Sequence, residues 1–319
     1  MKSINKAKSD FFYLQVIVII WGFTGIIGRF SELTAENLTA GRLFIASIFL
    51  ATIFLIRNIF RKDDPKKLKS PTTVRARPLL LAIFAGLLVA LHWTSFFQAI
   101  KISNVSTALT CMSTAGLFSS LLEAIFLYRS KPSKTALMLS VTCILGIFFI
   151  YADAISNLEG MLLAILSAFL AAAFTTINAY LQNTIKSSLN ISLIEMISGA
   201  LCCVVLSDLD WGAIFQTHNS YNLVTILVLG VICTAIPFMV SVKIMRSITP
   251  STLCISLNLE PIYAIILASL LFKEQEMMGV NFFIGATVVF LSAIFNGLTF
   301  KKASNASLPE FADNSGEIT

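Results

Sequence analysis

The chain has 319 residues, of which 56% are hydrophobic and 13% are charged, and its mean hydropathy is +0.84. Soluble domains carry about 25% charged residues, so this composition excludes an ordinary soluble protein and predicts a polytopic membrane protein. The formal net charge of +6 does not indicate nucleic-acid binding, because the basic residues gather in alternate loops between apolar segments.

Ten apolar segments follow one another along the chain, and we predict that each is a membrane-spanning helix. They are Phe12 to Phe30, Leu38 to Ile56, Pro78 to Phe97, Val105 to Tyr128, Thr135 to Tyr151, Gly160 to Leu181, Ile191 to Leu206, Leu223 to Val242, Pro250 to Phe272 and Met277 to Leu298. The first follows lysines, as a signal peptide would, but it lacks a small-x-small cleavage signal and is expected to remain uncleaved.

Basic residues lie almost entirely on one side of these predicted spans. Nineteen of the 23 Lys and Arg residues fall in the N-terminus, in alternate loops and in the tail. By the positive-inside rule both termini are cytoplasmic, and the protein is expected in the cell (inner) membrane. The loops on the opposite side carry acids, namely Glu32, Glu36, Asp153, Glu159, Asp208 and Asp210.

The six cysteines all lie within apolar spans and form no CxxC pair. They are expected to be packing residues and not disulfide partners or metal ligands. No cofactor and no metal ion is expected.

The ninth span carries Glu260 directly before Pro261. A carboxyl about eleven residues from the start of a helix lies roughly 16 Å along the axis, near the middle of a hydrocarbon core of about 30 Å. An acid at this depth costs at least about 2.5 kcal/mol, so we predict that it contacts substrate or carries a proton. Ser256 and Tyr263 share its helical face, and Pro261 is expected to kink the helix. The alternative is a hydrogen-bonded acid that holds helices together.

An internal repeat is indicated by a shift of 144 residues, which places 103–130 on 247–274. The identical pairs are Ser103 with Ser247, Leu109 with Leu253, Ala124 with Ala268 and Leu127 with Leu271. Because five spans are an odd number, two units of five must cross in opposite senses. The predicted fold is an all-α membrane protein with ten transmembrane helices as two inverted five-helix repeats, 10–152 and 157–300, followed by a disordered cytoplasmic tail over 301–319.

Three motifs occur in order along the chain. They are Trp21-Gly22 with Arg29 eight residues after the tryptophan, Arg42 with Ala46, and Leu259 to Tyr263 with Phe272 to Glu274. In order and spacing they resemble the EamA-type ten-helix exporters of the drug/metabolite transporter superfamily, over nearly the whole chain. The resemblance implies secondary transport of small metabolites. The chain departs from it at Ser130, where the family often has an acid, and at Gly116-Leu117, where the repeat partner has Glu260-Pro261.

Further residues within the spans are candidates for the wall of a transport pathway. They are Trp21, Thr24, His92, Trp93, Thr110, Thr114 and Asn178, with Pro237 as a second kink. Packing or hydrogen bonding inside the bundle explains most of them at least as well. His92 has no second ligand one turn away, so it does not predict a metal site.

Four charged residues lie near the ends of their spans. Arg29 and Arg42, at the outer ends, are expected to reach the headgroups or to make the outer mouth positive for anionic groups. Glu123 and Glu195, near the inner ends, are expected to reach water or to pair with Arg129 or Lys186, without a transport role.

The predicted function is the export of small metabolites, such as amino acids or amphipathic compounds, by alternating access between the two halves. A membrane enzyme acting on lipid is expected to carry H-E-x-x-H, G-x-S-x-G or paired intramembrane aspartates, and the sequence has none of these motifs. A channel is expected to carry repeated pore signatures, which the sequence also lacks. The sequence also lacks a P-loop, so ATP is not the direct energy source. The expected partners are the small-molecule substrate, the bilayer and protons as candidate coupling ion, without nucleic acid; the oligomeric state stays open, a monomer included.

Overall fold

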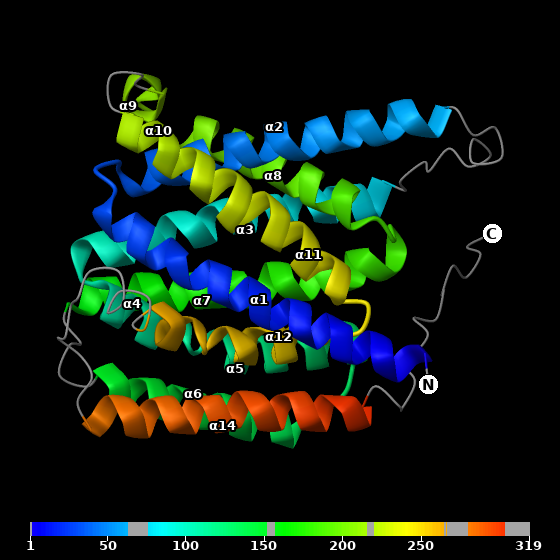
Figure 1. The fold of residues 1–319 in the computed structure, drawn as a ribbon, viewed down its shortest axis with the longest axis vertical. Helices are drawn as coiled ribbons and strands as arrows, with labels where there is room; N and C mark the ends of the chain where they lie inside the picture. Colours follow the sequence, from blue (N-terminus) through cyan, green and yellow to red (C-terminus); the bar gives the residue numbers. More distant parts are fainter. Residues whose placement is uncertain are drawn as a thin grey trace.

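The computed structural model describes residues 2–62, 76–151, 157–215, 220–264, 266 and 280–303. Within these ranges all regular structure is helical, and the helices lie side by side in one bundle (Figure 1). The helices are α1 (Lys2–Phe30), α2 (Ala35–Lys62), α3 (Ala76–Ile102), α4 (Val105–Met112), α5 (Ala115–Leu122), η2 (Glu123–Tyr128), α6 (Lys134–Tyr151), α7 (Leu158–Thr184), α8 (Ser188–Leu206), α9 (Trp211–Phe215), α10 (Ser220–Leu227), η3 (Val228–Ala235), α11 (Ile236–Ile244), α12 (Pro250–Leu257) and α14 (Val280–Ala303). η2 and η3 are π-helical.

Seven segments of the described chain are long and apolar enough to cross a membrane. They are Ser9–Gly28, Ala35–Phe60, Ala76–Ile102, Thr107–Tyr128, Leu158–Thr184, Ser188–Leu206 and Asn222–Ile244. Two shorter apolar helices, Lys134–Phe149 and Phe283–Asn296, fall on the predicted fifth and tenth spans. The predicted ninth span runs past the described residues. The all-helical, multi-pass character of the prediction is therefore confirmed, while the count of ten helices stays a prediction.

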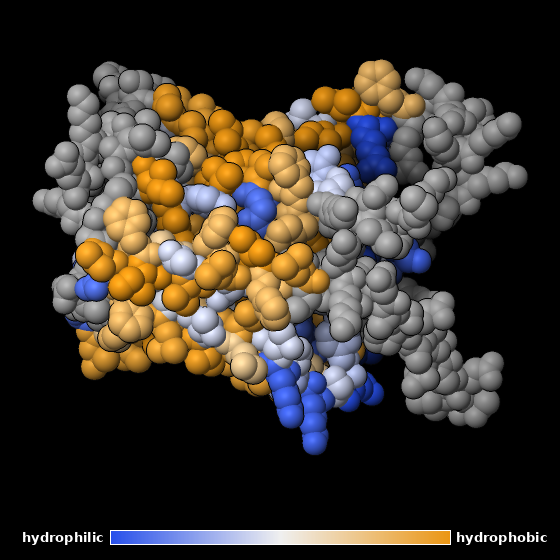
Figure 2. Space-filling view, turned by 60° about the horizontal axis from the view of Figure 1, so that its bottom comes forward, coloured by the Kyte–Doolittle hydropathy of each residue, from blue (hydrophilic) through white to orange (hydrophobic). Residues whose placement is uncertain are grey.

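The outer surface of the bundle is apolar, as contact with lipid requires. Figure 2 shows a broad hydrophobic face that few hydrophilic side chains interrupt. Exposed large apolar side chains lie on α6 and α14, which pack against each other, and they include Met138, Phe148, Phe283 and Leu291. Exposed apolar side chains of this kind are stable where hydrocarbon surrounds them.

Two helices are interrupted at equivalent places. α4 ends at Met112 and α5 begins at Ala115, while α12 ends at Leu257 and helical geometry resumes at Glu260. A shift of 144 residues superimposes the two interruptions to within one residue. The agreement adds a structural likeness to the few identities that the sequence offers.

Each interruption has a local chemical cause. The hydroxyls of Ser113 and Thr114 donate to carbonyls three residues earlier, at 2.6 Å in both cases, and so compete with the helical pattern. Pro261 has no amide hydrogen for the Leu257 carbonyl, and Leu259 N bonds to Ser256 O at 3.1 Å in a tighter turn. Ser113 and Thr114 in one helix and Pro261 in the other thus interrupt the backbone at equivalent places by different chemical means.

Contacts between helices follow a paired pattern. α3 packs on α7 and α8, and the continuous run of η3 and α11 packs on α1 and α2 in the corresponding way. α2 contacts α8, α5 contacts α12, and α6 contacts α14, so each of these contacts joins like positions of the two sequence repeats. The beginning of α1 and the end of α14 lie at the same end of the bundle (Figure 1). Residues 152–156, between the two predicted repeats, and 304–319, which form most of the predicted tail, lie outside the described residues.

Candidate functional site

Arg42 is a buried cation in the core of the bundle. Only 1% of its surface is exposed, and its Nε donates to Thr234 Oγ1 at 2.9 Å. The guanidinium carbon lies 3.9 Å from the ring centroid of Trp93 and 5.6 Å from that of Phe97, which is cation–π geometry. Nη1 has no hydrogen-bond partner within the described chain. The guanidinium is therefore held on one side and keeps a donor free for another acceptor.

The expectation that Arg42 reaches the headgroups is wrong. Its side chain turns inward because η3 offers a hydroxyl and α3 offers an aromatic face, and both compensate part of its desolvation. The side chain of Arg29 lies outside the described residues.

The π-helix η3 and the following proline position the groups around Arg42. Thr234 Oγ1 donates to Leu229 O at 2.6 Å, which leaves its lone pairs for the arginine. Pro237 cannot donate to the Cys233 carbonyl, and that carbonyl accepts a hydrogen bond from Trp21 Nε1 at 3.0 Å. A π-helical turn next to a proline thus joins α1 and α2 to η3. Such turns are frequent at functional sites.

Glu260 lies near Arg42, at the start of the helical residues 260–264. It is half-buried, and a Cβ added to Gly22 of α1 would come within 3.4 Å of the Glu260 carbonyl oxygen. Glu260, Arg42 and Cys233 are close enough to interact electrostatically, yet no salt bridge joins Glu260 to Arg42 within the described residues. An acidic and a basic side chain are thus near each other in the core without a salt bridge between them.

Several predicted residues meet around Arg42 and Glu260. Trp21 and Trp93 have the contacts given above, and the Thr24 hydroxyl lies beside the Cys233 thiol. Tyr263 packs against Gly22, where an added Cβ would lie 3.3 Å from Tyr263 Cβ. We call Trp21, Thr24, Arg42, Trp93, Thr234 and Glu260 the central cluster.

Other predicted residues are placed elsewhere. His92 Nδ1 lies 2.7 Å from Ser167 Oγ, and its ring packs against Phe174 at the edge of the central cluster. The hydroxyls of Ser256 and Thr114 bond to carbonyls of their own helices. Thr110 is buried in α4, and Asn178 bonds to Glu195 instead of a member of the central cluster.

Sequence reasoning missed Thr234, Cys233, Phe97 and Phe238 as neighbours of the site. Phe238 packs on Trp93 with ring centroids 6.1 Å apart, and Phe97 is fully buried. Aromatic residues are frequent in every span, so nothing in the sequence distinguishes these two. Thr234 is different, because a hydroxyl three residues before Pro237 is a sequence signal for irregular helix.

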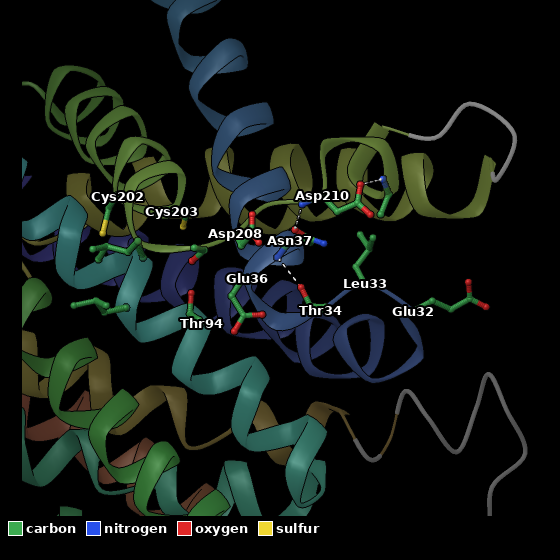
Figure 3. A pocket seen from close by; sticks show the side chains of 15 residues that line it. Glu32, Leu33, Thr34, Glu36, Asn37, Thr94, Cys202, Cys203, Asp208 and Asp210 are labelled. Carbon is green, nitrogen blue, oxygen red and sulfur yellow. Dashed lines mark hydrogen bonds between the residues drawn. The ribbon is translucent and has the colours of Figure 1, made fainter.

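A pocket of about 760 Å³ opens at the end of the bundle where α1 joins α2 (Figure 3). Its carboxylates are Glu32, Glu36, Asp208 and Asp210, and no Lys or Arg lines it. Asn37 Oδ1 accepts a hydrogen bond from Asp210 N at 3.1 Å, which ties α2 to the segment before α9. Four of the six acids expected in the loops on this side thus line one opening, while Glu159 does not line it and Asp153 lies outside the described residues. Within the described residues no group of His, Cys, Asp and Glu could hold a metal ion.

At the opposite end, hydrogen bonds connect neighbouring segments of the bundle. Glu123 is only 6% exposed, and its two oxygens accept hydrogen bonds from Ser251 N at 2.9 Å and Ser251 Oγ at 2.7 Å. Ser247 Oγ donates to Asp10, and Arg246 donates to the Lys186 carbonyl. The expectation that Glu123 reaches water or Arg129 is therefore wrong, because the carboxylate binds the N-terminus of α12.

Comparisons with known proteins agree with this architecture. The model of the EamA-like transporter family matches residues 10–152 and 158–298. A solved structure, titled only as the crystal structure of a protein, is similar with a TM-score of 0.67 at 15% identity, over 93% of this chain and 99% of that chain. At this identity the likeness shows the fold alone, and no curated protein matches the sequence. Since the family model covers nearly the whole chain in two copies, the protein belongs to the EamA-like transporter family.

Proposed function

We propose that the protein is a secondary transporter that exports small metabolites across the cell (inner) membrane by alternating access. The working units are two inverted five-helix repeats, 10–152 and 157–300, with ten spans and both termini cytoplasmic. The family, the paired helix contacts and the equivalent interruptions in α4/α5 and after α12 support this proposal.

The free Nη1 of Arg42 is the observation that carries the proposal. A buried guanidinium without a carboxylate partner is costly, and an anionic group of a substrate would supply the missing acceptor. A hydrogen bond to a charged group contributes about 1.5–3 kcal/mol. Trp93 and Phe97 would cover the apolar part of the same molecule. Amino acids and amphipathic acids have this combination of a carboxylate and an apolar body.

Glu260 is the proposed proton carrier of the cycle. An ionised Glu260 attracts Arg42, and a protonated Glu260 leaves Arg42 free for the substrate anion. The two ends of the bundle differ in a way that fits one state of such a cycle, since the acidic pocket opens at one end and hydrogen bonds connect the helices at the other.

The test is Glu260→Gln in purified protein reconstituted into liposomes, with a panel of amino acids and cationic drugs. Glutamine keeps the shape but removes the titration, so we expect exchange of substrate at equal pH to persist. Accumulation driven by an imposed pH gradient should be lost. Poor insertion or expression of the variant would instead support the purely structural role of Glu260. Unchanged gradient-driven accumulation would refute the proton-carrier role and leave Glu260 as a substrate contact at most.

A further inference from the structure

Glu195 and Asn178 form a second buried polar pair, apart from the central cluster. Both residues are 0% exposed, and Asn178 Nδ2 donates to Glu195 Oε2 at 3.3 Å. The other oxygen of each group, Glu195 Oε1 and Asn178 Oδ1, has no hydrogen-bond partner in the described chain. The expectation that Glu195 reaches water or Lys186 is therefore wrong.

No described cation compensates Glu195. The helices packed against α8 are α2, α3, α7 and α11, and Asn178 of α7 is the group that interacts with the carboxyl. The charged or titratable residues buried on these helices are engaged elsewhere, Arg42 with Thr234 and Trp93, and His92 with Ser167. Lys243 of α11 is exposed. A carboxylate anion at this position would be buried with one weak hydrogen bond, which is unfavourable.

Glu123 is a buried carboxyl of the same protein whose two oxygens both have hydrogen-bond partners. Its two oxygens each accept a hydrogen bond, both from Ser251, at the N-terminus of a helix. Glu195 lacks a donor on Oε1 and lies inside α8. The two buried acids therefore differ in their surroundings, since Glu123 has a donor for each oxygen and Glu195 does not.

A proton on Glu195 would satisfy both unpartnered oxygens at once. A carboxylic acid and a primary amide are complementary, since the amide N–H donates to one acid oxygen while the acid O–H donates to the amide carbonyl. The first of these bonds is present. The atoms that would make the second, Oε1 and Oδ1, are the two that lack a partner.

The contacts of two equivalent glycines give Glu195 the place in α8 that Arg42 has in α2. Gly86 and Gly230 are 144 residues apart, and both pack on the backbone of a neighbouring helix. A Cβ added to Gly86 would lie 2.4 Å from the Glu195 carbonyl oxygen, and one added to Gly230 would lie 3.1 Å from the Arg42 carbonyl oxygen. α8 and α2 are thus packed alike, with an acid in one and a base in the other.

We propose that Glu195 is a second proton-binding site, which holds its proton in a closed carboxylic acid–amide pair with Asn178. Binding of this proton does not depend on the proposed transport function. Release of the proton from Glu195 does rest on the proposed transport function. If the two halves exchange conformations during transport, the α3–α8 contact around Gly86 takes the form of the η3–α2 contact. The Glu195–Asn178 pair then opens.

Infrared spectroscopy of the purified full chain at neutral pH tests the proposal. A protonated carboxyl has a carbonyl stretching band that an ionised one lacks. We expect Glu195→Gln to remove one component of this band. Asn178→Leu should shift the same component to higher frequency, because the acid loses both hydrogen bonds. Glu260→Gln is the matched control and should leave that component in place.

Stability supplies an independent readout. Glutamine at position 195 has a carbonyl and an NH2 group with two N–H donors, and one of these N–H groups takes the place of the acid O–H opposite Asn178. Glu195→Gln should therefore keep the thermal stability of the wild-type protein, whereas Glu195→Leu should lower it. A band unchanged by Glu195→Gln would overturn the proposal. A Glu195→Gln variant that does not fold would refute the acid–amide pairing with Asn178. An unshifted infrared band in Asn178→Leu would also refute it.

Discussion

Removal of the Thr234 hydroxyl tests how Arg42 is held. Thr234→Val keeps the side-chain shape and deletes the acceptor that lies 2.9 Å from Arg42 Nε. Arg42 would then have two unpartnered donors, Nε and the already free Nη1, in a site where it is 1% exposed. A hydrogen bond to a charged group contributes about 1.5–3 kcal/mol, and a buried donor left alone costs a similar amount. We expect Thr234→Val to lower stability by about 2 kcal/mol.

This change is measured by thermal unfolding of the detergent-solubilised protein. Unfolding is monitored as the loss of the monodisperse peak in size-exclusion chromatography. For domains of 150–250 residues 1 kcal/mol corresponds to about 2–4 °C, so the midpoint should fall by roughly 4–8 °C or somewhat less in this longer chain.

Two variants separate the Arg42 contact from the loss of a hydroxyl. Thr176 is also a buried helical threonine, but its Oγ1 bonds only to Ala172 O of the same helix, at 2.8 Å. Thr176→Val should therefore change the midpoint little. Thr234→Ser keeps an acceptor and should restore most of the stability. Equal effects of Thr234→Val and Thr176→Val, or no rescue by serine, would refute the role assigned to the Arg42–Thr234 bond.

Two further predictions concern packing and capping. A Cβ at Gly230 would lie 2.6 Å from Ile45 Cβ, so Gly230→Ala should reduce the yield of folded protein on size-exclusion chromatography, while Gly25→Ala, whose nearest atom is 3.7 Å away, should not. Glu123→Gln replaces one of the two acceptors for Ser251 by an NH2 group, and should lower thermal stability by about 1–2 kcal/mol. Unchanged melting of Glu123→Gln would show that the carboxylate does not stabilise α12.

The helical layout was predictable because it depends on local properties of the chain. Apolar segments of membrane length gave positions that the described helices follow, and the 144-residue shift anticipated a likeness between the fourth and ninth spans. Pro261 marked the place where the ninth span is interrupted, since a missing amide hydrogen is a property of one residue. The fourth span gave a weaker signal, because Ser113 and Thr114 could also have bonded within a continuous helix.

The surroundings of the buried charges were not predictable, because their partners are far away in the sequence. Arg42 and Thr234 are 192 residues apart, and Trp21 and Cys233 are 212 residues apart. Position within a span suggested that Arg42 would reach the headgroups, and only the tertiary neighbours decide that it turns inward. The same holds for Glu123 and Glu195. Both lie near the ends of their predicted spans, but both form hydrogen bonds with residues of other helices.

The unlike chemistry of the two halves bears on how the transporter could work. Gly116 is the repeat partner of Glu260, and a Cβ there would already lie 3.1 Å from Ile255 Cγ1 and 3.1 Å from Ser140 Oγ. A second glutamate therefore has no room in this packing, even though the two helices are interrupted at the same place. Similar backbones would allow the halves to exchange conformations, while different side chains keep the central acid in one half. Because α12 and the residues after it bear Glu260 and α2 bears Arg42, a relative movement of the halves changes the distance between these two charges. That distance is the quantity through which proton binding and substrate binding would be coupled.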